Sequence, residues 1–170
     1  MFRFAVFALF VAVAGAVSLK SCGKNNLVDV KKLSINPSTI VFPGKLNIDA
    51  AAIVNKEIKG RVDVQVTLKK KVLFAWVKIP CISNVGSCLY RDICSELKKF
   101  TCPPEMIAQN IQCQCPFKPG PVSFNMDGID LPTIPTGFGS FVNGQYRAKA
   151  VIRADGKEIG CLEAEVKLKS

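Results

Sequence analysis

The sequence has 170 residues, a formal net charge of +10 at pH 7 and no histidine. This length suits one domain with one hydrophobic core. Without histidine, the Ser-His-Asp and Cys-His arrangements of common hydrolases are excluded. The excess of Lys and Arg favours anionic partners, such as acidic phospholipids or sulfated glycans.

The first residues have the features of a secretory signal peptide. Arg3 precedes an apolar run over 4–14, which small residues follow up to Ala16, and the run is shorter than the ~20 residues that a membrane-spanning helix needs. We expect residues 1–16 to be a signal peptide cleaved after Ala16. Loss of Arg3 lowers the charge of the remaining domain, 17–170, from +10 to +9. Export indicates a secreted or lysosomal protein and argues against a nucleic acid partner.

Eight cysteines follow this segment, namely Cys22, Cys81, Cys88, Cys94, Cys102, Cys113, Cys115 and Cys161. An even number in an exported chain predicts disulfides. A zinc site is disfavoured because the chain has no Cys-x-x-Cys pair and no histidine, and we expect neither a metal nor another cofactor. Eight cysteines allow 105 pairings, so their spacing does not give the connectivity.

Alternating apolar and polar residues predict half-buried antiparallel strands at 46–54 and 61–69. The small Ala50 and Ala52 leave either close sheet packing or space for a guest molecule, and close packing is the commoner case. Residues 146–154 and 157–169 flank Asp155-Gly156, a dipeptide typical of a type I′ turn, and predict a C-terminal hairpin. The fold class is therefore all-β, a two-sheet antiparallel sandwich.

One short helix is predicted at 92–100, with Asp92 as its N-cap and Ile93, Leu97 and Phe100 on one face. It lies within 81–115, where six of the eight cysteines fall, so disulfides should hold this region together. Residues 116–144 contain five prolines, which favours loops over strands.

Two apolar segments each allow two interpretations. Residues 72–77 follow three lysines and contain Phe74 and Trp76. They form either a strand buried on both faces, which the residues alone slightly favour, or a loop that enters a membrane while the lysines contact headgroups. Residues 131–142 contain Ile134, Phe138 and Phe141, and fit a core segment and a membrane-contacting or gating loop equally well.

Two pairs of carboxylates resemble the pair that a glycosidase uses. Glu163 and Glu165 lie on the polar face of a predicted strand, and Asp127 and Asp130 lie in a predicted loop. Both settings are typical of solvated surface charge. The glycines at 137 and 139 lack the lysine and the strand-to-helix context of a phosphate-binding loop. We predict no catalytic residue and no enzyme activity.

Several separated motifs together resemble one family. They are Trp-Val-Lys-Ile-Pro-Cys at 76–81, Val-Gly-Ser-Cys at 85–88, Cys-Gln-Cys-Pro-Phe-Lys at 113–118, Gly-Gln-Tyr-Arg at 144–147 and Gly-Lys-Glu-Ile-Gly-Cys at 156–161. With 40–44 and all eight cysteines, and in this order and spacing, they resemble the ganglioside-activator group of the ML lipid-recognition family. The resemblance covers residues 22–168.

The resemblance implies a β-cup, in which two antiparallel sheets enclose an apolar cavity. It also implies four disulfides, Cys22–Cys161, Cys81–Cys88, Cys94–Cys115 and Cys102–Cys113. The implied function is extraction of a glycolipid from a membrane and presentation of its headgroup to a hydrolase of the β-hexosaminidase type. An alternative function within the same family is presentation of a lipid to a receptor in immunity or lipid transport.

The lipid-binding residues implied by the resemblance form a wall and a rim. The wall consists of Ile48, Val62, Val64, Val66, Leu68, Phe117, Phe124, Tyr146 and Ile152. The rim consists of 72–76 and 134–142, with Phe74, Trp76, Ile134, Phe138 and Phe141, which raises the membrane-loop interpretation of both segments above the buried one. Phe138 and Phe141 stand where the vertebrate activators carry a tryptophan. Without histidine, acid activation would depend on carboxylates, near about pH 4 to 5.

Overall fold

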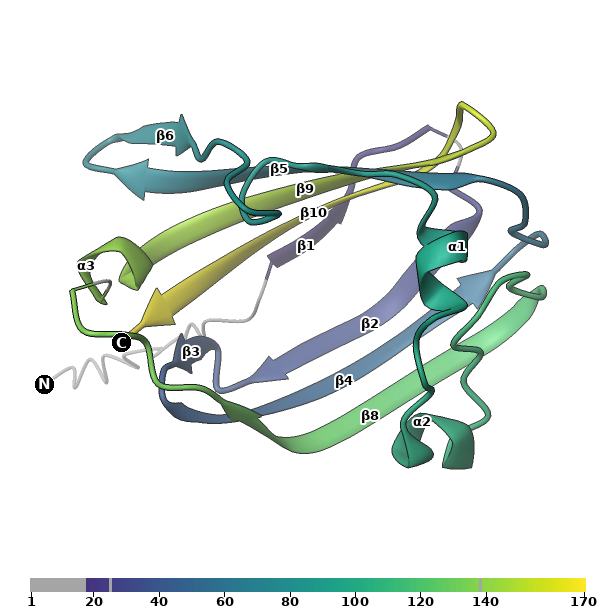
Figure 1. Cartoon of the computed structure of the whole chain (residues 1–170), viewed down its shortest axis with the longest axis horizontal. Helices are drawn as coiled ribbons and strands as arrows, with labels where there is room; N and C mark the ends of the chain where they lie inside the picture. Colours follow the sequence, from purple (N-terminus) through teal and green to yellow (C-terminus); the bar gives the residue numbers. More distant parts are fainter. Residues whose placement is uncertain (1–17, 25, 138) are drawn as a thin grey trace, which may run out of the picture.

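Two sheets face each other in the computed structural model, which describes residues 18–24, 26–137 and 139–170 (Figure 1). The predicted signal peptide lies outside the described residues. The larger sheet has the strand order β1-β10-β9-β5-β6, with β3 beside β10 and β7 beside β5. The smaller sheet has the order β2-β4-β8. All neighbours are antiparallel except β3 and β10.

The strands of the larger sheet are β1 (Ser18–Ser21), β3 (Thr39–Val41), β5 (Val62–Val72), β6 (Ala75–Lys78), β7 (Leu89–Tyr90), β9 (Gly144–Ala154) and β10 (Lys157–Lys169). Those of the smaller sheet are β2 (Val28–Asn36), β4 (Gly44–Val54) and β8 (Gly120–Leu131). The predicted strands at 46–54 and 61–69 and the C-terminal hairpin are thus confirmed. Asp155 and Gly156 have φ of 47° and 81°, the two positive values that a type I′ turn requires.

The prediction of loops throughout 116–144 is wrong, because β8 is a strand of twelve residues. Its prolines flank the strand rather than interrupt it: Pro121 lies near its start, and Pro132 follows its end. Between them Val122, Phe124 and Met126 are more buried than the polar residues with which they alternate. Proline content outweighed this alternation in the prediction, although a proline at a strand end removes no central ladder bond.

The described residues form three short helices rather than one, α1 (Ile93–Leu97), α2 (Pro104–Ala108) and α3 (Gly139–Val142). The predicted N-cap is confirmed, since the Asp92 carboxylate accepts a hydrogen bond of 3.3 Å from the backbone N–H of Ser95. The helix it caps ends at Leu97, before the predicted Phe100. Within the described ranges, no helix combines the length and the apolar character needed to cross a membrane.

Four disulfides join Cys22 to Cys161, Cys81 to Cys88, Cys94 to Cys115 and Cys102 to Cys113. These are the pairs that the family resemblance implied. The first joins residues 139 positions apart and ties the N-terminal segment to β10. The other three lie within 81–115, so short covalent loops brace the region that has the fewest strand residues.

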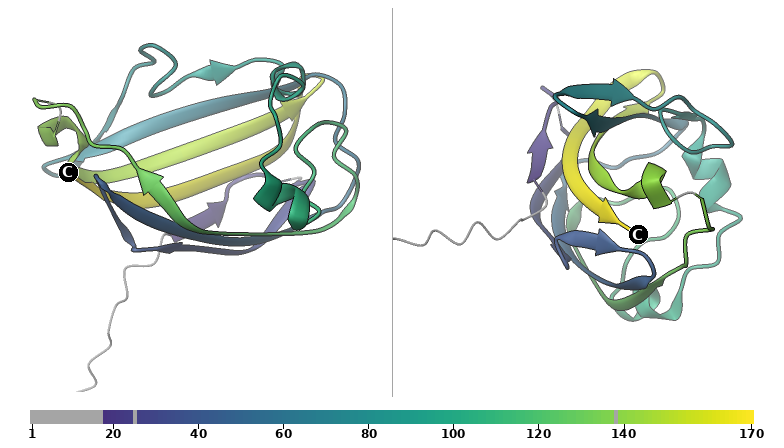
Figure 2. Two further views of the ribbon diagram at one scale, coloured as in Figure 1. Left: turned by 60° about the horizontal axis from the view of Figure 1, so that its bottom comes forward. Right: turned by 90° about the vertical axis from the view of Figure 1, so that its left-hand side faces the viewer.

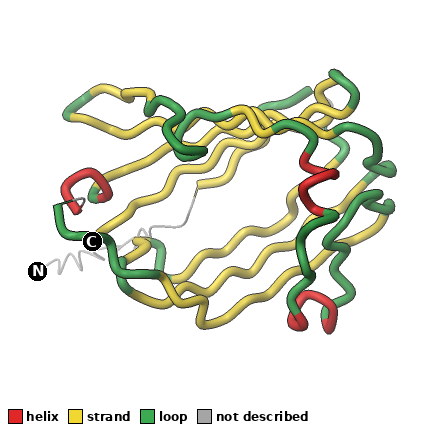
Figure 3. The backbone as a smooth tube through the Cα atoms, in the orientation of Figure 1, coloured by secondary structure: helices red, strands yellow, loops and turns green. Residues whose placement is uncertain are grey.

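The two sheets lie opposite each other (Figure 2, left), but the side chains between them are incompletely covered. None of the described side chains is completely buried, and the apolar residues of the facing rows are mostly half-buried. Closed sandwiches bury large apolar side chains completely, because the two inner faces interdigitate. The most buried cluster, Val54, Ile58, Val62 and Cys94, lies where α1 bridges the two sheets (Figure 3). The molecule is therefore a cup packed at the α1 end.

Candidate lipid-binding cup

An apolar cavity of about 360 Å³ lies between the sheets at the α1 end. Its volume is within the range of roughly 300–1,000 Å³ that small-molecule sites occupy. The residues that line it are Val28, Ala52, Val54, Ile58, Val62, Val64, Ile93, Leu97, Gln112, Phe117, Lys118, Val122 and Ile152. Because almost all of these side chains are apolar, the site suits hydrocarbon.

Four of the predicted wall residues, Val62, Val64, Phe117 and Ile152, line this cavity. The sequence prediction missed Ala52 and Val54, although they continue the alternation that begins at Leu46. It also missed Ile93 and Leu97 of α1, which line the cavity. The sequence predicts that these two side chains share one face of a helix, but it does not predict that this face belongs to the cavity wall. The disulfide Cys94–Cys115 and the packing of α1 help to bring that face to the sheets.

A carboxylate on β5 fixes the start of α1 beside the cavity. Asp63 accepts hydrogen bonds of 2.8 Å from the backbone N–H of Asp92 and 3.1 Å from Nε of Arg61. These bonds lower the pKa of Asp63, the backbone bond contributing most. The charged form of this carboxylate therefore stabilises the attachment of α1 to the larger sheet.

The other predicted wall residues continue the apolar rows beyond the cavity toward the α3 end. On β5, Val66 lies opposite Ala150, and Leu68 lies opposite Ala148. On the smaller sheet Phe124 is paired with Ala50, and Ile48 with Met126. These four pairs of side chains and Tyr146 on β9 share the faces that carry the cavity residues but do not line the cavity itself.

Residues 72–77 form the tip and second arm of the β5–β6 hairpin, so the interpretation as a doubly buried strand is wrong. The side chains of Leu73 and Phe74 are 84% and 98% exposed at the tip. The preceding lysines, 69–71, and Lys78 lie on the paired strands beside the tip. Figure 2 (right) shows the hairpin and α3 at the same end of the cup. An apolar tip with a basic base matches the surface of an anionic membrane.

Trp76 does not lie at the tip but on the outer face of the larger sheet. Its ring packs 4.3 Å from the guanidinium of Arg147, a cation–π contact. Arg147 donates to Glu165 at 2.9 Å through Nε and lies 3.8 Å from Glu163. These contacts hold the β5–β6 hairpin against β9 and β10. It also places the two glutamates on the outer face, as predicted, engaged in an ion pair.

The second predicted rim segment lies around α3. Ile134 is half-buried and Phe141 is 71% exposed, while Phe138 lies outside the described residues. The carbonyl of Phe141 accepts hydrogen bonds from the hydroxyl of Tyr146 and, at 2.8 Å, from Nζ of Lys70. Tyr146 is buried, and this burial raises the pKa of its phenol, so the hydroxyl keeps the proton that it donates.

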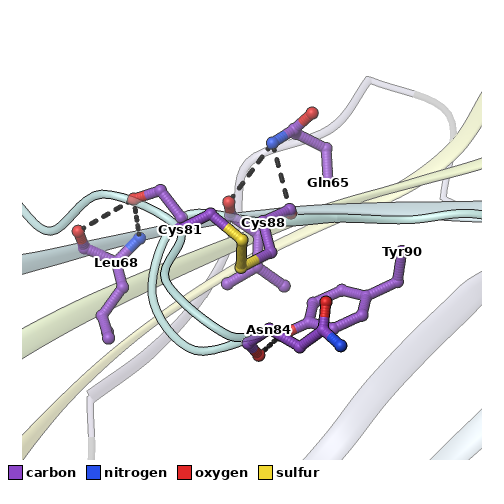
Figure 4. The surroundings of a disulfide bond; sticks show 8 residues. Gln65, Leu68, Cys81, Asn84, Cys88 and Tyr90 are labelled. Atoms are coloured by element: carbon purple, nitrogen blue, oxygen red, sulfur yellow. Dashed lines mark hydrogen bonds between the residues drawn. A yellow bond between two sulfur atoms is a disulfide. The ribbon is translucent and has the colours of Figure 1, made fainter.

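A further apolar projection, missed in the sequence, is the loop closed by Cys81–Cys88 (Figure 4). Ile82 and Val85 exchange two backbone hydrogen bonds of 2.9 Å around a two-residue turn and expose their side chains. The hydroxyl of Tyr90 donates to the carbonyl of Asn84 at 2.8 Å. The disulfide and these bonds make the loop a rigid extension beside β5.

Chemistry based on free thiols or clustered metal ligands has no support in the part of the chain that the structure describes. All eight cysteines are in disulfides. No group of three or more Asp, Glu or Cys residues there is arranged to hold a metal ion. The second carboxylate pair, Asp127 and Asp130, lies on β8 rather than in the predicted loop, and Asp130 forms a 2.7 Å ion pair with Lys45.

Known proteins resemble this chain over most of its length. The model of the ML domain family matches residues 16–168. The chain belongs to the ML domain family. It is 30% identical to the ganglioside GM2 activator of Mus musculus over 164 residues, which cover 91% of this chain and 83% of the relative. It is 29% identical to that of Macaca fascicularis over 167 residues, covering 91% and 84%.

Among solved structures, the chain resembles the crystal structure of a Niemann-Pick type C2 protein from Japanese carpenter ant. The TM-score is 0.46 at 14% sequence identity, and the likeness covers 89% of this chain and 99% of the other.

Proposed function

We propose that this protein is a non-catalytic lipid carrier of the activator type. It extracts a glycolipid from a membrane, holds the acyl chains between its two sheets and presents the headgroup to a glycoside hydrolase. Its relatives of about 30% identity are named ganglioside GM2 activators. The observation that carries the proposal is the apolar cavity, which continues into half-buried apolar rows.

The energetics of lipid extraction explain why a carrier needs such an interior. Moving a lipid chain from a bilayer into water costs about 0.8 kcal/mol per methylene, so one long acyl chain costs more than about 10 kcal/mol. A carrier must offer a replacement apolar surface of similar extent. The wall residues Ile48, Val62, Val64, Val66, Leu68, Phe117, Phe124, Tyr146 and Ile152 supply that surface in this proposal.

The β5–β6 tip supplies the contact with the membrane. Leu73 and Phe74 enter the acyl region, while the lysines at its base meet headgroup phosphates. Each lysine near an anionic surface contributes about 1 kcal/mol. Phe141 enters beside them from α3, and Trp76 serves the same rim by holding the hairpin against Arg147.

Transfer of a fluorescent glycolipid between vesicles tests the proposal directly. Purified protein should accelerate transfer, and replacing part of the phosphatidylcholine by phosphatidylserine should accelerate it further. The matched control is the protein with its disulfides reduced, which loses the braces of the α1 end. Absence of transfer at every vesicle composition would refute the carrier function.

The partner and the location follow from the same proposal. The partner is a hydrolase of the β-hexosaminidase type, and the protein acts in the lysosome or after secretion. The measurement is hydrolysis of a membrane-embedded glycolipid by such a hydrolase with and without the protein. Stimulation of the hydrolase, with no headgroup released by the protein alone, is expected. Release by the protein alone would instead identify an enzyme.

A further inference from the structure

Lys70 is a charged residue on an otherwise uncharged inner row. The alternation Val62, Val64, Val66, Leu68 continues to Lys70, and the register pairs Lys70 with Tyr146 of β9 on the same face. The inner-row side chains at 46–54 of β4, 62–68 of β5, 122–126 of β8 and 146–152 of β9 are all uncharged. Lys69 and Lys71, its two neighbours in sequence, lie on the outer face.

The surroundings accommodate this side chain specifically. Its Nζ donates to the Phe141 carbonyl at 2.8 Å and lies 5.6 Å from the centre of the Tyr146 ring. Gly144 has a φ of 145°, and a Cβ there would lie 3.1 Å from Cε of Lys70. The glycine therefore leaves room for the lysine to cross β9 toward α3. The cation is placed at the α3 end, where the apolar rows stop.

A lipid whose tails lie along these rows brings its headgroup to the end of the rows, next to this cation. An oxyanion attracts an ammonium group through a full opposite charge, which a neutral acceptor such as a backbone carbonyl lacks. The Phe141 carbonyl is neutral, so a carboxylate or phosphate of a headgroup displaces it. The carbonyl then keeps the Tyr146 hydroxyl as its donor.

We propose that Lys70 selects cargo with an acidic headgroup by exchanging the Phe141 carbonyl for the headgroup oxyanion. The inference rests on the proposed carrier function and deepens it, because it names a residue that distinguishes acidic from neutral lipids. Lysines on the outer face, such as Lys71, contribute to membrane binding without contributing to this choice.

The experiment compares transfer of trace fluorescent lipids from phosphatidylcholine vesicles, whose surface charge is then the same in every arm. Two pairs are used. The first is phosphatidylglycerol against phosphatidylcholine, whose phosphate charge is cancelled by the choline cation, and the second is a sialylated glycolipid against its asialo form. The wild-type protein should prefer the acidic member about tenfold, which corresponds to one charge-assisted bond. Lys70→Gln should abolish the preference, and Lys70→Arg should retain it.

Two control variants separate the charge of Lys70 from other effects. Lys71→Gln removes the same charge from the outer face, so it should slow both lipids equally and leave their ratio unchanged. Lys69→Gln removes a second charge from the outer face, and should also preserve the ratio. A ratio that survives Lys70→Gln, or that falls as much in either control, overturns the inference.

Free oxyanions distinguish a headgroup from a soluble ligand. Inorganic phosphate and free sialic acid, added as competitors at millimolar concentration, should leave the ratio unchanged, because neither has a tail that the cup can hold. Competition by either would overturn the lipid headgroup as the ligand. Equal transfer of acidic and neutral lipids by the wild type would refute the role of Lys70 alone, whereas the carrier function itself fails only if no lipid is transferred.

Discussion

The two ends of the cup are built on different principles. At the α1 end, disulfides and the most buried cluster surround an apolar cavity. At the α3 end, Leu73, Phe74 and Phe141 project into solvent, and hydrogen bonds to the Phe141 carbonyl anchor α3. Covalent bracing therefore accompanies the end that we propose to hold the acyl chains, while the end that we propose to meet the membrane relies on non-covalent contacts.

The largest expected effect comes from removing the apolar tip. The double substitution Leu73→Asp/Phe74→Asp should weaken binding to phosphatidylserine-containing vesicles by about 100-fold or more, since each buried apolar side chain contributes about 1.5–3 kcal/mol. Vesicle co-sedimentation measures the loss.

The matched control for the tip is Ile107→Asp on α2. Ile107 is 60% exposed but lies away from the α3 end (Figure 1), so this change should leave binding intact. Equal losses in both proteins would show that the two ends do not differ in membrane contact.

A smaller effect is expected from filling the cavity at the opposite end. Ala52 lines the cavity, and Ala52→Phe should reduce the bound lipid found by native mass spectrometry about tenfold, because the new ring occupies the space of several methylenes. The melting temperature should not fall, since a filled cavity regains packing contacts.

The neighbouring Ala51 provides the control for this change. It is paired with Ser123 on the outer face of the smaller sheet, and Ala51→Phe should leave lipid occupancy unchanged. If both variants lose lipid equally, the cavity at the α1 end does not hold the acyl chains.

The smallest expected effect is that of acidic pH on the attachment of α1 to the larger sheet. Hydrogen bonds lower the pKa of Asp63 in the folded protein, so its contribution to stability is complete above its ordinary value of about 3.9 and is lost only as the pH falls through the lower folded value. Arg61, Arg91 and the cross-strand Arg153 face this carboxylate, and Asp92 supplies the backbone donor. Hydrogen exchange of α1 should therefore stay protected at about pH 4.5.

Loosening of α1 between about pH 6 and 5 would contradict this assignment. The substitution Asp63→Ala should lower protection of α1 at all these pH values, whereas Asp130→Ala, which removes a carboxylate paired with Lys45 on the smaller sheet, should not. A loss of protection in Asp63→Ala but not in Asp130→Ala would show that the carboxylate at the α1 end, and not the one at the α3 end, controls the attachment of α1.

Local sequence patterns predicted the strands in which one face is exposed to solvent and the other is buried. The alternation around Val64 and the Asp155-Gly156 turn identified β5 and the C-terminal hairpin correctly. The strand β8 was missed because prolines at its ends resemble those of a loop in composition. The hairpin at 72–77 was misread from residues alone because an exposed apolar tip and a buried strand have the same composition.

The site was predicted only in part, because alternation along a strand is a local pattern. Alternation gives the face on which Val62 and Val64 lie, but it does not show which stretch of an apolar row encloses a cavity. Ile93 and Leu97 line the cavity only because α1 is docked through Asp63 and Cys94. Trp76 illustrates the limit, since its place on the outer face depends on the register of β6 with β5 and on Arg147.

The sequence by itself determined the strand periodicity, the cysteine count and the basic charge, because these depend only on neighbouring residues and composition. Its motifs also indicated the family. Tertiary structure alone decided that the cavity lies at the α1 end, which strands pair side by side and that Nζ of Lys70 reaches the Phe141 carbonyl of α3. The physical reason is strand register: a shift of one residue exchanges the inner and outer faces, and only pairing with distant strands sets that register.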